Sequence, residues 1–379
     1  MHAQPAPRKE FKDFEFNLRE LGGSIGDFGT LFPLAIGYIA INGLNPAGLF
    51  LVLGLTNIAL GLIYRMPMPL EPKKLIAATA ISQRWAPSMV YASGFGLGLT
   101  WLFLTATGLL RKLVEITPKY IVTGIRLALG LALAWKALQL MQPAPLLGAL
   151  AIVIVLVLRD NRFAPAALVL LAIGLGMVAF QGKLPAFTGF QPTLPPFTLP
   201  RLGEVWQAML LAGFAQIPLT LTNAVIAPAA LIREYFPKKE VSEQKLMLNM
   251  GVMNIAGSLF AGMPMCHGAG GFAGQYYFGA RTGGAPIMEG VIEVGIGLFL
   301  SKYIMGIMVN FPMPLVAGML LLVGIQLCLS AVKLRGWELA LALVTAVAGV
   351  ALNLGFGYII GVIAAWIYKR FRTAVQDST

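Results

Sequence analysis

Two segments of this sequence combine prolines, glycines and charged side chains in a way that suits anion binding. Residues 66–74 read MPMPLEPKK, and residues 263–271 read MPMCHGAGG. The prolines prevent a continuous helix through the first segment, because proline lacks the N–H donor and restricts the residue before it. We expect one short helix to begin near Pro72 and a second near His267. The free N–H groups and the dipole at each helix N-terminus attract negative charge.

Groups at these two helix starts are the candidate anion ligands. Lys74 is the first candidate side chain; its alternative role is an ion pair with Glu71 on the same helix face. His267 is either a donor to the anion, able to change charge near neutral pH, or a capped histidine without this role. Backbone donors need no particular side chain, and glycine permits close approach. They are Gly268, Ala269, Gly270 and Gly271.

Other polar residues within apolar segments extend this set. Asp27 is flanked by Gly26 and Gly29; it is either a protonatable buried carboxylate or the structural partner of a nearby lysine. Thr30 is a candidate donor to an oxyanion. Gln216 and Asn223 are candidate ligands from the second half of the chain. The alternative for Asn223 is a hydrogen bond to a neighbouring helix.

A pair of carboxylates lies farther along the chain. Glu289 and Glu293 are four residues apart and share a helix face, and Glu289 is a candidate for proton coupling. Arg126 is expected at a similar depth, where a bridge to these carboxylates would connect two domains. The cysteines, Cys266 and Cys328, lie in apolar segments without motif spacing. We expect no disulfide, metal site or cofactor.

The composition places all these residues in a membrane protein. The chain has 379 residues, of which 58% are apolar and 12% charged, with a mean hydropathy of +0.78. Soluble domains carry about 25% charged residues, so we expect no water-soluble enzyme. The formal charge of +12 comes from basic residues scattered singly, which argues against a nucleic-acid partner.

The apolar runs predict about fourteen membrane-spanning segments. Their expected ranges are 20–41, 46–64, 66–83, 87–110, 118–140, 144–158, 164–180, 203–231, 242–261, 263–280, 285–304, 312–332, 337–351 and 354–371. With residues 1–19 in the cytoplasm, most Lys and Arg residues outside the spans fall on the inner side. The positive-inside rule therefore places both termini in the cytoplasm, and we expect the cell membrane as the location.

An internal repeat organises these spans. Residues 54–68 (GLTNIALGLIYRMPM) and 251–265 (GVMNIAGSLFAGMPM) are identical at eight of fifteen positions. Seven spans in each half predict two repeats of opposite orientation, as in secondary transporters. The first repeat covers 20–180, a proline-rich connector covers 181–202, and the second repeat covers 203–371.

Several of these motifs resemble a known family. ELGGSIGDFGTLFPL (20–34), MPMPLEPKKLIAA (66–78), QIPLTLTNAVIA (216–227) and MCHGAGGFAGQYYFGARTG (265–283) are similar to segments of the MOT1-type molybdate transporters. That family is distantly related to the sulfate permeases and uracil permeases. Glu71 stands where the family usually has Gln, and it is a candidate for the proton-coupling group.

The resemblance implies an all-α fold of the uracil-permease and sulfate-permease type. A core domain (20–110 plus 203–304) would carry the substrate, and a gate domain (118–180 plus 312–371) would pack against it. We therefore expect a secondary transporter that imports molybdate by alternating access, coupled to protons. The alternatives are a sulfate or tungstate transporter, a proton-coupled nucleobase carrier and a passive anion channel. A homodimer is a further arrangement that we consider.

Overall fold

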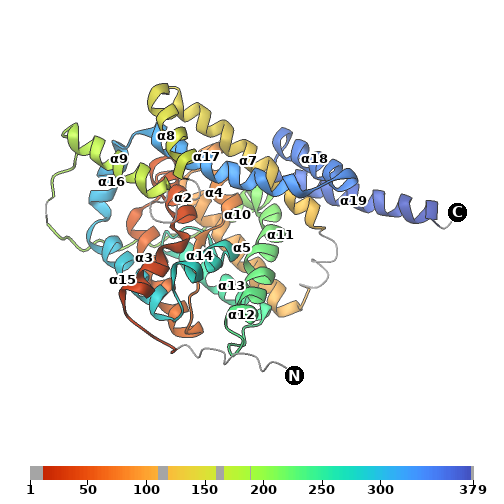
Figure 1. The fold of residues 1–379 in the computed structure, drawn as a ribbon, viewed down its shortest axis with the longest axis horizontal. Coiled ribbons are helices and arrows are strands. Elements are labelled where there is room, and N and C mark those ends of the chain that lie inside the picture. The colour runs from red at the N-terminus through yellow and green to blue at the C-terminus, as the bar shows by residue number, and fades with distance from the viewer. Residues whose placement is uncertain (1–11, 110–117, 159–165, 188, 377–379) are drawn as a thin grey trace, which may run out of the picture.

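The structure is a computed structural model of the whole chain. It describes residues 12–109, 118–158, 166–187 and 189–376, with only the backbone for 27–30, 167, 168 and 371–376. Helices dominate the described residues (Figure 1). In the first half they are α1 (Leu18–Ser24), α2 (Phe28–Ala40), α3 (Pro46–Tyr64), α4 (Lys74–Gln83), α5 (Pro87–Thr107), α7 (Lys119–Met141), α8 (Pro145–Leu158) and α9 (Ala166–Phe180). In the second half they are α10 (Leu202–Ala208), α11 (Phe214–Thr220), α12 (Ala227–Tyr235), α13 (Glu243–Leu259), α14 (Ala269–Phe278), α15 (Gly284–Phe299), α16 (Ser301–Val309), α17 (Met313–Leu329), α18 (Gly336–Ala351) and α19 (Leu354–Gln376).

Each expected span overlaps at least one helix, and several helices have the length and apolar character of a membrane span. Among the described residues, five helical stretches meet both criteria. They are Pro46–Tyr64, Pro87–Thr107, Lys119–Met141, Leu202–Tyr235 and Met313–Lys333. A sixth is added if α15 and α16, which meet at 76°, form one span. The chain is therefore a multi-pass membrane protein, and the count of fourteen spans stays a prediction.

Helices α4 and α14 both follow short extended segments, as the prolines predict for the first segment and its match to 263–271 predicts for the second. The strands β1 (Glu71–Pro72) and β2 (Met265–Cys266) pair antiparallel, with Glu71 opposite Cys266. The Lys73 N–H extends this contact by donating to the Pro264 carbonyl at 2.9 Å. Both helices begin two residues later than expected, because strand pairing holds the preceding residues extended. The two helix starts consequently lie next to each other.

The structure interrupts two expected spans, because 285–304 is divided between α15 and α16, which meet at 76°, and 20–41 is divided near Gly26. A 3-10 turn at Ile25–Asp27 separates α1 from α2. The backbone of α14 crosses this turn so closely that a Cβ added to Gly26 would lie 2.4 Å from the Gln275 nitrogen. Only glycine fits such an approach. This long-range contact is not visible in the hydropathy of residues 20–41, which explains the missed break.

The long helices pack in pairs. Among the larger contacts are those of α3 with α15, α5 with α13, α7 with α17 and α18, and α8 with α17. Figure 1 shows α7, α8, α17, α18 and α19 along one side of the molecule and α3, α13, α14 and α15 along the other. At the α3–α15 crossing, a Cβ on Gly54 would lie 2.5 Å from the Gly290 carbonyl oxygen. Small residues at helix contacts let membrane helices approach closely.

The segment before α1 and α1 itself make polar contacts with the ends of other elements. The Asp13 carboxylate pairs with Arg65 at 3.0 Å and with Lys239 at 2.5 Å. The buried Glu20 carboxylate accepts hydrogen bonds from the backbone N–H groups of Arg281 and Thr282. These contacts tie the start of the described chain to the end of α3 and to the loop before α15.

The Asp13 contacts predict an acid-dependent loss of stability. Hydrogen bonds from Lys239 and Arg65 hold the pKa of Asp13 below its usual value. Its stabilising contribution is therefore complete above the ordinary aspartate pKa and is lost as the pH falls through the lowered value. We expect D13N to melt slightly below the wild type at neutral pH, because exposed ion pairs contribute little, and this gap should close in acid. Thermal unfolding in detergent across pH measures it; a gap independent of pH would contradict the assignment.

Candidate anion site

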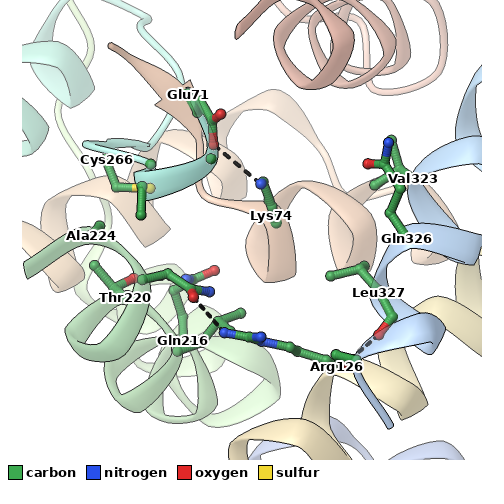
Figure 2. Close-up of a pocket in the computed structure, with 16 residues that line it drawn as sticks. Glu71, Lys74, Arg126, Gln216, Thr220, Ala224, Cys266, Val323, Gln326 and Leu327 are labelled. Carbon is green, nitrogen blue, oxygen red and sulfur yellow. Dashed lines mark hydrogen bonds and ion pairs between the residues drawn. The ribbon is translucent and has the colours of Figure 1, made fainter. Parts of the chain in front are cut away.

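A cavity of about 240 Å³ lies where α4, α14, α7, α17 and the α11–α12 region meet. Figure 2 shows its side chains projecting from these elements. Its walls combine two basic residues, one acidic residue, neutral polar groups and aliphatic groups. The lining residues are Glu71, Lys74, Arg126, Gln216, Leu219, Thr220, Asn223, Ala224, Cys266, Gly268, Ala269, Gly270, Val323, Gln326, Leu327 and Ser330.

The N-terminus of α14 presents unpaired backbone donors to this cavity. Gly268 precedes the helix, and no side chain caps it. Among the described residues, the N–H groups of Ala269, Gly270 and Gly271 have no hydrogen-bond acceptor. Gly268, Ala269 and Gly270 line the cavity, whereas Gly271 is buried outside the lining. Such a helix end favours an anion through both its donors and its dipole.

The N-terminus of α4 differs, because Gln216 caps it. The Gln216 Oε1 atom accepts the Leu75 and Ile76 N–H groups at 3.0 and 3.2 Å. Its Nε2 atom donates to the Thr220 hydroxyl at 2.7 Å. Gln216 thus positions α4 from the neighbouring helix, and its role as a direct ligand stays a prediction. The two helix starts therefore differ: the first N–H groups of α14 are free to bind an anion, whereas two of those of α4 already donate to Gln216.

Glu71 and Lys74 form an ion pair at the wall of the cavity, the alternative role foreseen for Lys74. Lys74 Nζ lies 3.2 Å from Glu71 Oε2, and the two side chains are 30% and 2% exposed. Figure 2 shows this pair as a dashed line. The carboxylate also packs against the start of α14, since a Cβ added to Gly268 would lie 2.1 Å from Oε2. A negative side chain therefore already occupies part of the region that favours anions.

This contact predicts that Gly268→Ala disturbs the site. The added methyl group would displace the Glu71 carboxylate, and overpacking of this kind costs about 1–3 kcal/mol. We expect a lower melting temperature and a marked loss of anion uptake. Gly295→Ala in α15 is the matched control, because Gly295 lies outside the cavity lining and its Cβ would meet no atom of the described residues within 4 Å. Equal effects of both substitutions would argue against a special role for the Glu71–Gly268 contact.

Arg126 enters the cavity from α7 and was not among the expected ligands. Its guanidinium donates to the Asn223 Oδ1 atom, which agrees with the interhelical role considered for Asn223. The bridge from Arg126 to Glu293 is absent from the described contacts; Glu293 instead accepts from Asn57 at 2.8 Å. The signal available in the sequence was an arginine inside a predicted span, a feature that commonly marks a transport pathway.

The remaining candidates lie outside the cavity lining or outside the described side chains. His267 is fully buried, with Nδ1 3.4 Å from the Pro69 carbonyl oxygen. Glu289 lines a separate, mainly apolar cavity of about 450 Å³ together with Glu293. The side chains of Asp27 and Thr30 are not described. The roles of these four candidates therefore stay predictions.

Comparison with known proteins places the chain in a family. A family model described as "Molybdate transporter of MFS superfamily" matches residues 19–133 and 208–327. The chain belongs to this molybdate transporter family. Molybdate transporter 2 of Arabidopsis thaliana is 31% identical over 89% of this chain and 85% of its own length. Molybdate transporter 1 of the same plant is 30% identical over 92% of this chain and 87% of its own length.

Solved structures of anion transporters share the fold of this family member. The overall structure of SLC26A9 matches with a TM-score of 0.70 and 13% identity, over 96% of this chain and 67% of that one. The transmembrane domain of a cyanobacterial bicarbonate transporter, BicA, matches with a TM-score of 0.62 and 15% identity, over 94% and 99%. At these identities the likeness concerns the fold alone.

Proposed function

We propose that this protein imports molybdate and that the cavity at the start of α14 is the binding site. The observation that carries this proposal is the uncapped helix N-terminus facing a cavity that also contains Lys74 and Arg126. The family assignment supports anion transport, and its curated relatives are named for molybdate. A nucleobase carrier is less favoured, because a neutral base gains less than an oxyanion from two cations and a helix dipole at one site.

Binding of a tetrahedral dianion follows from the available groups. The Ala269 and Gly270 N–H groups donate to the oxyanion, and the α14 dipole adds favourable charge. Lys74 exchanges part of its interaction with Glu71 for the new anion. Hydrogen bonds that involve charged groups contribute about 1.5–3 kcal/mol each. The site therefore needs no metal or cofactor to hold an oxyanion.

Charge balance supports proton coupling through Glu71. Lys74 and Arg126 supply two positive charges at the cavity, and Glu71 supplies one negative charge. A dianion would leave an excess negative charge at a site within the predicted membrane spans, and such charge is costly. Protonation of Glu71 would remove this excess. We propose that the oxyanion and a proton enter together and that Glu71 carries the proton.

The packing of the helices supports two inverted repeats and two domains. In the order of predicted spans, α3, α5, α7 and α8 of the first half correspond to α13, α15, α17 and α18 of the second. The α3–α15 contact therefore corresponds to the α13–α5 contact, and the α18–α7 contact corresponds to the α8–α17 contact. The structure contains all four contacts. The strands β1 and β2 exchange with each other. We propose that 20–110 with 203–304 forms the core, and that 118–180 with 312–371 forms the gate. The cavity takes its lining from residues of both proposed domains, an arrangement that suits alternating access.

Uptake into vesicles tests this function. The purified protein is reconstituted, and labelled molybdate uptake is followed with and without an inward proton gradient. We expect saturable uptake that accumulates molybdate when the gradient is imposed. Competition by sulfate, tungstate and uracil ranks the alternative substrates. Stronger inhibition by uracil than by any oxyanion would overturn the proposal, and uptake that never exceeds equilibrium would indicate a channel.

A further inference from the structure

Arg126 carries the one positive charge at the cavity that no carboxylate offsets among the described residues. Lys74 has Glu71 at 3.2 Å, whereas the acceptor that the structure gives Arg126 is the neutral amide oxygen of Asn223. The half-buried guanidinium also has a buried Nε atom that has no hydrogen-bond partner within the described part of the chain. A permanent charge with unused donors at a cavity wall is suited to a ligand that brings its own negative charge.

The position of Arg126 separates it from the rest of the anion site. It extends from α7, while Lys74, Gly268 and Ala269 come from α4 and the start of α14. Figure 2 shows Arg126 reaching toward the Gln216–Thr220 helix from the side opposite the Glu71–Lys74 pair. An oxyanion between these walls would receive neutral donors from α14 on one side and a full charge from α7 on the other.

We propose that Arg126 is the residue that makes this site prefer doubly charged oxyanions over singly charged ones of the same shape. The inference rests on the proposed function, since it concerns the same cavity. Backbone N–H groups and the Glu71–Lys74 pair accept a monoanion or a dianion of one tetrahedral shape. Coulomb attraction to a full charge is twice as large for the dianion. The α14 start also attracts a dianion more strongly, but its dipole is equivalent to only about half a positive charge, so the full charge of Arg126 contributes the larger part of the preference.

The hydrogen bond to Asn223 holds the Arg126 guanidinium in place before an anion binds. A charged acceptor makes a stronger hydrogen bond to a guanidinium than a neutral amide oxygen does. An oxyanion can therefore displace Asn223, whereas a weaker acceptor cannot. Because Asn223 lies in the π-helical segment Leu221–Ile226 between α11 and α12, its release also loosens a contact between α7 and this segment.

The test uses pairs of tetrahedral oxyanions that differ mainly in charge. Molybdate is compared with perrhenate, and sulfate with perchlorate, by direct binding to the purified wild-type protein and to R126Q, R126K and N223A. We expect the wild type to prefer the dianion of a pair. R126Q should reduce this preference by about tenfold or more while perrhenate binding persists, which also shows that the variant is folded. R126K should keep most of the preference, and N223A should still prefer the dianion, because the guanidinium charge remains.

The outcomes separate this inference from the proposed function. A preference that is unchanged in R126Q would overturn the role of Arg126 while leaving molybdate transport intact. Equal loss of both anions in R126Q and R126K would show a structural role and would also overturn it. If the wild type binds sulfate but not molybdate, the proposed substrate fails, and the sulfate–perchlorate pair still tests Arg126. If it binds no dianion, both proposals fail.

Discussion

Lys74→Met is expected to raise the KM for molybdate by roughly 10- to 100-fold. This range corresponds to the loss of one hydrogen bond to a charged group, about 1.5–3 kcal/mol. The methionine keeps the length of the side chain, so packing along α4 changes little. The variant also leaves Glu71, with a side chain only 2% exposed, without its cationic partner, and this adds repulsion toward an incoming anion. Initial uptake rates over a range of molybdate concentrations measure the effect.

The same substitution one residue earlier is the control. Lys73 is fully buried outside the cavity lining, and its Nζ lies 5.6 Å from the centre of the Trp101 ring. Lys73→Met removes an equal charge from the same turn of the chain, and we expect the KM for molybdate to stay within about twofold, because no ligand contact is lost. A large rise in KM for Lys73→Met with a small one for Lys74→Met would reverse the assignment of the two lysines.

Local sequence signals predicted the broken spans well, because their causes are themselves local. Proline at 67, 69 and 72 excludes a continuous helix wherever the rest of the chain lies. The break at 263–271 could be predicted because its Met-Pro-Met matches the Met-Pro-Met at 66–68 within the internal repeat. The structure then places β1 beside β2, which brings the two helix starts together. From the sequence alone, only the inverted repeat predicted that the starts of α4 and α14 would lie close together.

Features that depend on contacts between distant residues were not predictable in this way. Gln216 caps α4 from a helix about 140 residues away, and polarity alone made it resemble a ligand. His267 adjoins the α14 start in sequence, yet it faces Pro69 and lies outside the cavity. Arg126 could be recognised as unusual but not as a cavity residue, because the contact of α7 with the α11–α12 region fixes its direction. Side-chain direction within a bundle is set by packing, which hydropathy does not encode.

Glu71→Gln is expected to abolish accumulation of molybdate driven by a proton gradient. Glutamine retains the shape of the side chain and a hydrogen-bond acceptor for Lys74, but it cannot bind the proton that balances the dianion. Wild-type uptake should increase as the outer pH falls, by at most about tenfold per pH unit for one proton. The variant should show almost no such dependence. Exchange of labelled for unlabelled molybdate across the vesicle membrane should persist, because exchange requires no net movement of charge or protons.

Comparison with a second buried carboxylate identifies the proton site. Glu289 is 3% exposed and lines the separate apolar cavity, so Glu289→Gln removes a buried acid without changing the anion site. If Glu71 carries the proton, Glu289→Gln accumulates molybdate in a pH-dependent way and Glu71→Gln does not. The reverse result would move proton coupling to the α15 carboxylates and leave Glu71 as a static partner of Lys74. Loss of exchange as well as accumulation in Glu71→Gln would instead show that the carboxylate holds α14 in place through its contact with Gly268.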